Sequence, residues 1–158
     1  MTLLIREIAA GDREEIDSIA RALHPTWFTK RALEDIAHAV QTQNGYVAVD
    51  DGRCVGFGTY MPTSNPKTAE LTWIGVHPDL HRRGVGRRLV NALERELAGK
   101  GYEWLEVSTV AETEDYEPYA RTRSFYHAVG FIDLAVESKG WPSGDDRLLL
   151  RKHLKTTS

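Results

Sequence analysis

The chain has one cysteine among its 158 residues, no long apolar run, no internal repeat and no marked excess of either charge. A single thiol, Cys54, excludes a disulfide framework and a metal site built from cysteines. A formal charge of −3 argues against a dedicated nucleic-acid or membrane-surface binder. Because no segment is apolar enough to cross a bilayer and no signal peptide is visible, the sequence predicts a cytoplasmic protein without a membrane partner.

What is present is typical of a globular domain. Hydrophobic residues make up 41% of the chain and charged residues 27%, both ordinary values. This length suffices for one domain with its own core. Residues 1–158 are therefore expected to form a single domain, with residues 155–158 frayed.

Apolar spacing predicts alternating helices and strands. Asp12 and Glu15 read as a capping box for a first helix, and Thr29 as the cap of a second that stops at Asn44-Gly45. The predicted strands cover residues 3–8, 46–49, 54–61, 70–76, 104–110, 131–137 and 147–154, with further helices near 89–97 and 118–129. This gives the order strand, two helices, three strands, helix, strand, helix and two strands.

The strands over 70–76 and 104–110 are joined through a helix, so they must be parallel neighbours. Strand alternation also predicts the faces of the first of them. Glu70 and Thr72 should share one face, while Leu71 and Trp73 share the other.

The segment that follows residue 76 is the most informative in the chain. A strand runs into a turn broken by proline, then into a basic, glycine-rich loop (residues 81–86) and a helix. Such a junction directs helix N-terminal N–H groups at one spot and suits an anion. Gly84 and Gly86 would let the backbone approach that anion closely. The alternative is a tight turn with a solvated basic rim.

Two familiar phosphate-binding loops do not fit this segment. A P-loop needs Lys followed by Ser or Thr after its last glycine, and here Arg87 and Arg88 follow Gly86. A dinucleotide-binding loop needs a third small residue where this chain has Leu89.

The loop instead resembles the acyl-CoA pyrophosphate loop of the GNAT superfamily of N-acetyltransferases, Gln/Arg-x-x-Gly-x-Gly/Ala, with His81 at its first position. A second stretch, Arg121–Phe131, resembles the helix-to-strand signature of the same family, in which a Phe-Tyr pair precedes Gly-Phe. One departure is that Tyr119 stands where the family often has an Asn, which puts one hydrogen bond to pantetheine in doubt.

The resemblance implies an α/β (α+β) GNAT fold. Its mixed sheet has about seven strands, one parallel pair that splays apart at its C-terminal ends, and four flanking helices. Acetyl-CoA is implied as co-substrate, and no metal is expected. The residues implied to bind acetyl-CoA are Ile74, Val76, His81, Arg82, Arg83, Gly84, Val85, Gly86 and Arg87.

The resemblance also implies catalytic roles. Tyr126 is similar to the family's general acid for the thiolate, although a core tyrosine is the alternative. Glu70 is similar to a glutamate that acts as base through water, and a solvated strand-start glutamate is nearly as good an explanation. The Val76 N–H is the implied oxyanion donor. Glu106 and His127 are weaker candidates for the base, and Cys54 is discounted.

Three segments are candidates for the wall of an acceptor pocket, namely residues 25–28, 112–117 and 141–142. The acidic run 112–117 would attract a cationic amine, although a solvated acidic loop is the commoner explanation. Aromatic residues in these loops predict either a ligand wall or a homodimer contact.

The leading hypothesis is an acetyl-CoA-dependent N-acetyltransferase that acts on a primary amine of a small molecule or peptide by direct transfer in a ternary complex. The alternative is a catalytically degenerate acyl-CoA-binding sensor or interaction module. A nucleic-acid partner is disfavoured, because the basic residues are confined to one loop.

Overall fold

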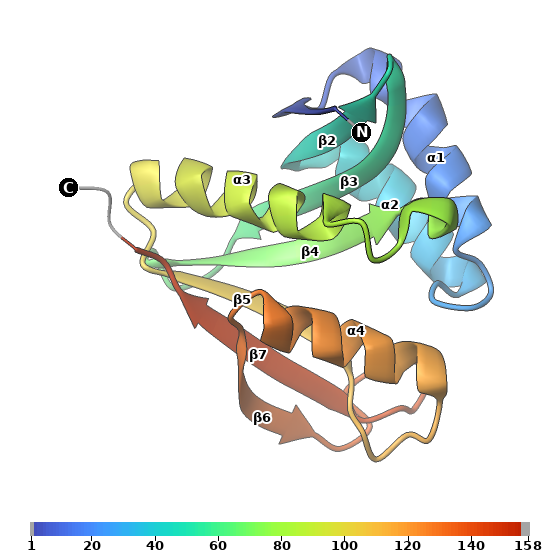
Figure 1. Ribbon diagram of the computed structural model, residues 1–158. Coiled ribbons are helices and arrows are strands. Elements are labelled where there is room, and N and C mark those ends of the chain that lie inside the picture. The colour runs from blue at the N-terminus through green and yellow to red at the C-terminus, as the bar shows by residue number, and fades with distance from the viewer. Residues whose placement is uncertain (1, 156–158) are drawn as a thin grey trace.

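A seven-stranded mixed sheet in the order β1-β2-β3-β4-β5-β7-β6 organises the chain (Figure 1). The computed structural model describes residues 2–155, so all of the expected frayed end at 155–158 except Lys155 lies outside the described residues. The elements are β1 (Leu3–Glu7), η1 (Ala10–Asp12), α1 (Arg13–Ala22), α2 (Lys30–Thr42), β2 (Asn44–Asp50), β3 (Arg53–Pro62), β4 (Thr68–Val76), η2 (Pro78–Leu80), α3 (Val85–Gly99), β5 (Trp104–Val110), α4 (Glu117–Ala128), β6 (Ile132–Glu137) and β7 (Arg147–His153). The predicted order of elements is confirmed.

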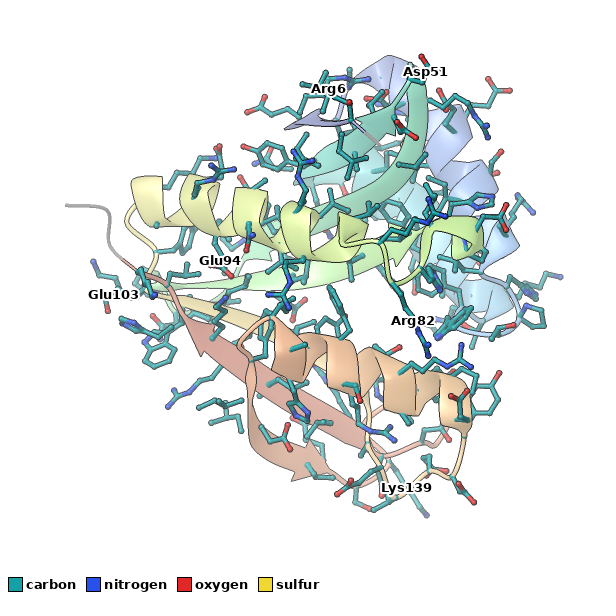
Figure 2. All side chains as sticks on the ribbon, in the orientation of Figure 1. Arg6, Asp51, Arg82, Glu94, Glu103 and Lys139 are labelled. Atoms are coloured by element: carbon teal, nitrogen blue, oxygen red, sulfur yellow. The ribbon has the colours of Figure 1, made fainter. Side chains whose placement is uncertain are left out.

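Helices cover the sheet on both faces. The helices α1 and α2 pack against β2 and β3 through a core cluster that includes Ile16, Ile36 and Phe57. On the opposite face, α3 and α4 share a cluster with β5 and β7 that includes Leu93 and Tyr126. Side chains fill the space between these layers (Figure 2). Within residues 2–155, no helix combines the length and apolar character needed to cross a bilayer.

The second helix begins as predicted and ends earlier than predicted. Thr29 Oγ1 accepts a hydrogen bond from the Ala32 N–H at 3.1 Å, which satisfies one free donor of the first turn. The helix ends at Thr42, and Asn44 and Gly45 are the first residues of β2. The predicted stop at Asn44-Gly45 is therefore wrong. Gly45 is needed within the sheet, because a Cβ there would lie 2.2 Å from the carbonyl oxygen of Gly58.

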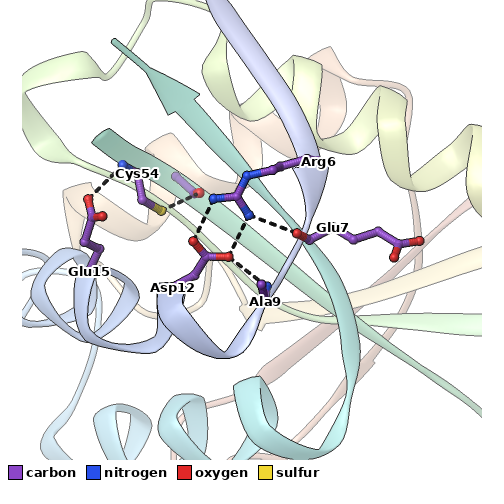
Figure 3. Close-up of polar contacts among 7 residues, drawn as sticks. Arg6, Glu7, Ala9, Asp12, Glu15 and Cys54 are labelled. Atoms are coloured by element: carbon purple, nitrogen blue, oxygen red, sulfur yellow. Dashed lines mark hydrogen bonds and ion pairs between the residues drawn. The ribbon is translucent and has the colours of Figure 1, made fainter. Parts of the chain in front are cut away.

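The predicted capping box of Asp12 and Glu15 is also wrong (Figure 3). Asp12 instead receives two hydrogen bonds of 2.8 Å from the Arg6 guanidinium and one of 2.7 Å from the Ala9 N–H. Glu15 accepts a hydrogen bond of 2.8 Å from the Cys54 N–H. Both carboxylates therefore tie the start of α1 to the sheet, because a 3-10 turn precedes the helix and places them beside β1 and β3.

A β-bulge at Thr72 overturns one predicted face. Trp73 pairs with Thr59 and Leu71 pairs with Tyr60, so Thr72 is an extra residue on β4. Leu71 is buried in the cluster with α3, whereas Trp73 packs against the cluster with α1 and α2. These two side chains do not share a face, because the bulge reverses the alternation between them. Thr72 hydrogen-bonds to Thr59 and Gln43.

The Arg6–Asp12 pair predicts a pH-dependent contribution to stability. Hydrogen bonding to Arg6 lowers the pKa of Asp12, so its stabilisation is present above the unfolded pKa of about 3.9 and is lost as pH falls through the lower folded value. Asp12→Asn should reduce the unfolding free energy at pH 7 by about 1–3 kcal/mol, measured by urea denaturation. The deficit should shrink below pH 4.

Asp17→Asn provides the control, since Asp17 pairs with Arg21 on the exposed side of α1. Exposed pairs of this kind contribute about 0.3–0.5 kcal/mol. Equal losses from the two substitutions would contradict a structural role for the Arg6–Asp12 pair.

Candidate active site

The parallel pair β4/β5 opens into a wedge, which confirms the expected splay. The two strands pair from Thr68 and Trp104 to Leu71 and Val107, and no further. Beyond that point β4 continues to Val76 and β5 to Val110, and the two diverge (Figure 1). The bulge at Thr72 lies where the separation starts, and bulges bend the strand that carries them.

Main-chain groups of β4 face this wedge. The His77 N–H donates to the Val55 carbonyl at 2.9 Å, so the odd-numbered residues near this end of β4 bond to β3. In an antiparallel ladder the intervening residues direct their N–H and C=O groups the other way. The Ile74 and Val76 groups therefore point toward β5, which has turned away. The Val76 carbonyl accepts a hydrogen bond of 2.8 Å from His81 Nε2.

The loop before α3 presents charge and helix N–H groups at the open end of the wedge. Arg82 and Gly84 both have left-handed backbone conformations, with φ of 66° and 80°, and α3 begins at Val85. Arg82, Arg83 and Arg87 are exposed, while the Val85 side chain is buried, so Val85 can offer a ligand only its main chain. Figure 2 shows Arg82 on the side of the loop that faces α4.

The structure explains the glycine at position 86 differently from the sequence analysis. A Cβ on Gly86 would lie 2.9 Å from the ring of Phe125, so this glycine allows α3 and α4 to pack closely. At Gly84 a Cβ would meet nothing within 4 Å, and the positive φ is what requires glycine. Room for an anion therefore explains neither glycine by itself.

Tyr126 lies on α4 within the core cluster that also contains Leu71 and Val107, the last paired residues of β4 and β5. Its ring packs on Phe131 with centroids 5.6 Å apart, and the residue is 5% exposed. Burial raises the pKa of its hydroxyl well above the usual range, so the hydroxyl is protonated near pH 7. No residue in the described part of the chain hydrogen-bonds to it.

Glu70 is half-buried on the face of β4 opposite Ala69 and Leu71. Burial raises the pKa of its carboxyl, Arg147 opposes that shift, and Glu106 adds to it. Glu106 is the direct neighbour of Glu70 across the parallel pair. The two weaker candidates for the base therefore lie in different places. Glu106 lies beside Glu70, whereas His127 hydrogen-bonds to Asp133 on the exposed surface.

Cys54 is buried against α1, and burial raises the pKa of its thiol to about 11. A thiol in this state is not ionised near pH 7, and the thiolate is the nucleophilic form. The geometry thus agrees with discounting Cys54. Within residues 2–155, no three His, Cys, Asp or Glu side chains are grouped so that they could hold a metal ion.

Two of the predicted acceptor-wall segments meet at the mouth of the wedge. Trp27 Nε1 donates to the Pro118 carbonyl at 3.0 Å, and the Tyr116 hydroxyl donates to the Thr26 carbonyl at 2.8 Å. The Trp27 ring also contacts the His81 ring, with centroids 5.0 Å apart. The loop between α1 and α2 is therefore fastened both to the start of α4 and to the loop before α3.

The third segment reaches β5 from the loop between β6 and β7. Trp141 Nε1 donates to the Thr109 carbonyl at 3.0 Å, and Arg147 stacks on the Trp141 ring, 5.4 Å from its centroid. Arg123 of α4 donates to the Val110 carbonyl at 2.8 Å. Sequence reasoning missed Arg123 and Arg147. Arg123 lies inside the stretch Arg121–Phe131, whose resemblance gives it no role, and Arg147 belongs to no recognisable motif.

A model of the Acetyltransferase (GNAT) family matches residues 12–131 of the chain. A GNAT-family protein from Desulfovibrio desulfuricans has a similar structure, with a TM-score of 0.86 and 23% identity over 98% of this chain and 100% of that one. The ribosomal-protein-S18-alanine N-acetyltransferase from Escherichia coli is similar with a TM-score of 0.78 and 19% identity over 99% and 97%. An aminoglycoside 6'-N-acetyltransferase complexed with coenzyme A is similar with a TM-score of 0.78 and 19% identity, over 98% of this chain and 99% of that one.

Among curated proteins, the chain is 35% identical over 95 residues to the uncharacterized protein ML0378 of Mycobacterium leprae (strain TN). That alignment covers 60% of this chain and 24% of the relative, so the chain matches about a quarter of the relative's length. The solved structures share the fold, a mixed sheet of seven strands with one parallel pair and four helices.

The contact between Gly86 and Phe125 predicts that Gly86→Ala lowers the unfolding free energy by about 1–2 kcal/mol, because the added methyl group overpacks the contact. Phe125→Leu should relieve most of that loss in the double variant. Gly99→Ala, at a helical glycine of α3 with nothing within 4 Å, is the control and should cost nothing. Thermal and urea unfolding measure all three, and equal effects at Gly86 and Gly99 would contradict the packing explanation.

Proposed function

Because the chain belongs to the Acetyltransferase (GNAT) family, we propose that it is an acetyl-CoA-dependent N-acetyltransferase. Residues 1–158 form one acyltransferase domain that acts in the cytoplasm on a primary amine of a small molecule or peptide. Transfer is direct, within a ternary complex. The observation that carries the proposal is the wedge between β4 and β5, with the basic loop before α3 at one end and Glu70 and Tyr126 beside its base.

The residues present suit acetyl-CoA. The main-chain groups of Ile74 and Val76 face the wedge and suit the amide groups of a pantetheine arm. The loop His81–Arg87 offers helix N–H groups and three exposed arginines to a pyrophosphate. A protein of the same fold is complexed with coenzyme A. When bound, acetyl-CoA supplies an acetyl group that is activated as a thioester.

Three groups of this chain then have distinct tasks. The Glu70 carboxylate accepts a proton from the ammonium form of the acceptor, directly or through water, so that the nitrogen has a free electron pair. The Val76 N–H, the expected oxyanion donor, lies six residues along β4 from Glu70, so the Ile74 N–H, which also faces the wedge, is the nearer group to stabilise negative charge that develops on the carbonyl oxygen. As the C–N bond forms and the C–S bond breaks, the protonated Tyr126 hydroxyl gives its proton to the sulfur, and the second proton of the attacking nitrogen passes through water to the resulting tyrosinate.

The direct test is an amine panel with detection of released thiol, together with thermal unfolding in the presence of acetyl-CoA. At a hundredfold excess over Kd, acetyl-CoA should stabilise the fold by about 2.7 kcal/mol. Stabilisation with turnover of at least one amine supports the enzyme. Stabilisation without turnover of any amine points to the acyl-CoA-binding module, and no stabilisation contradicts both.

Tyr126→Phe should lower kcat by about 10²- to 10⁴-fold, the usual contribution of a general acid, with little change in the Kd for acetyl-CoA. Tyr102→Phe is the control, because Tyr102 packs against the same core cluster from beyond the C-terminal end of α3. Steady-state kinetics and calorimetry measure the two effects. If Tyr126→Phe retains the wild-type kcat, then water protonates the sulfur.

The raised pKa of Glu70 predicts an acidic limb in the pH–rate profile above the ordinary glutamate value of about 4.3. Activity falls as the pH drops through that pKa, because the base must be ionised. Glu70→Gln should remove the limb and lower the plateau. Glu106→Gln should keep the plateau and move the limb to lower pH, because it removes a neighbouring negative charge. An acidic limb that persists in Glu70→Gln assigns the base to another group.

A further inference from the structure

Arg147 is a half-buried cation on the same side of the sheet as Glu70. In the register of β5 and β7, Ser108 and Arg147 share one face, and Glu106 shares it with Glu70 across the parallel pair. Arg147 Nε donates to Ser108 Oγ at 2.9 Å. Ser108 is the first residue of β5 beyond its pairing with β4. The guanidinium therefore stands at the base of the wedge, on the face away from α3 and α4.

The guanidinium is fixed in place and its outer nitrogens remain available. Trp141 stacks on it, and the Arg147 Cβ lies 2.6 Å from where a Cβ on Gly140 would be, so only glycine fits there. Within residues 2–155, the carboxylate that forms an ion pair with Arg147 is that of Glu137, whose Oε2 lies 3.9 Å from Nη1. This distance is beyond hydrogen-bond range, and Glu137 is itself exposed. Among residues 2–155, no carboxylate hydrogen-bonds to the Arg147 fork.

The other charged groups on this face leave Arg147 as the cation nearest the wedge. Arg151 follows on β7 opposite Glu106, and its guanidinium lies 4.2 Å from the centroid of the Trp104 ring. Glu70 and Glu106 are the carboxylates. This face of the sheet thus offers the Glu70 carboxylate, which suits an ammonium group, and the Arg147 guanidinium, which suits a carboxylate. The two lie close enough for Arg147 to lower the pKa of Glu70.

We propose that the amine acceptor is a free amino acid, whose carboxylate binds the outer nitrogens of Arg147 while its amino group lies toward Glu70. This rests on the proposed acetyltransferase activity and narrows its acceptor. A planar guanidinium binds a carboxylate through two parallel hydrogen bonds, and the stacking on Trp141 orients that plane in advance. The carboxylate of the acceptor also adds a close partner for the charge of Arg147, whose ion pair with Glu137 is 3.9 Å long and lies beyond hydrogen-bond range.

The test compares each L-amino acid with its own α-carboxamide, which keeps the amine and the side chain and removes the carboxylate. Released thiol gives kcat/KM at the pH plateau. The amino acid should exceed its amide by about 10- to 100-fold, the range of a hydrogen bond to a charged group. Arg147→Gln should lower kcat/KM for the amino acid by a similar factor and leave the amide within a few-fold. Arg147→Lys, which keeps the charge without the fork, should lie between them.

Arg151→Gln is the matched control on the same face and should leave the ratio of amino acid to amide unchanged. Calorimetry supplies a readout without turnover, since the N-acetylated amino acid should bind the protein with coenzyme A more tightly than its N-acetylated amide, and Arg147→Gln should abolish the difference. Thermal unfolding checks that each variant is folded.

The outcomes separate the two proposals. If amines are acetylated but amino acids and amides react equally, the acceptor proposal is overturned and the acetyltransferase stands. Equal losses for both substrates in Arg147→Gln make Arg147 a structural residue and also overturn it. If no amine is acetylated, the proposed activity fails, and equal binding of the two N-acetylated probes then overturns the carboxylate site as well.

Discussion

The constraint on which the site depends is the early end of pairing between β4 and β5. After Leu71 and Val107 the two strands are no longer paired. Beyond this point, each strand is held by hydrogen bonds to neighbouring elements. Thr72 bonds to Thr59 of β3 and to Gln43 at the end of α2. On β5, Trp141 and Arg123 bond to carbonyl groups near its C-terminal end. The separation of β4 and β5 is therefore stabilised by hydrogen bonds on both strands.

The two ends of this wedge carry opposite charge. Four arginines, Arg82, Arg83, Arg87 and Arg88, are exposed in and just after the loop that precedes α3, where helix N–H groups add further positive potential. Glu70 and Glu106 lie at the other end of the opening, on the face beside α1 and α2. A long ligand with an anionic end and an acyl end fits this polarity in one direction only. A mildly acidic chain can therefore present a locally positive surface, because its basic residues are gathered in one loop and the first turn of the helix that follows it.

The sequence predicts what is local and misses what is not. Apolar periodicity and turn residues place all the strands and helices in order, and Thr29 caps its helix as predicted. Asp12 and Glu15 match a capping pattern, yet both are drawn to Arg6 and Cys54, which only the folded sheet brings near. The bulge at Thr72 depends on the register with β3. Arg147 belongs to no motif. Its role follows from contacts with Ser108 of β5, which is distant in the chain, and with Trp141 in the loop between β6 and β7.

Residue-resolved amide hydrogen exchange by NMR, with and without acetyl-CoA, tests the central claim most directly. The claim is that the main-chain groups of Ile74 and Val76 face a wedge that binds the co-substrate. The account predicts that saturating acetyl-CoA slows exchange of the Val76 amide markedly, while the His77 amide, already bonded to Val55, changes little. If acetyl-CoA saturates the protein and leaves exchange at Val76 unchanged, the co-substrate binds elsewhere and the wedge is not the active site.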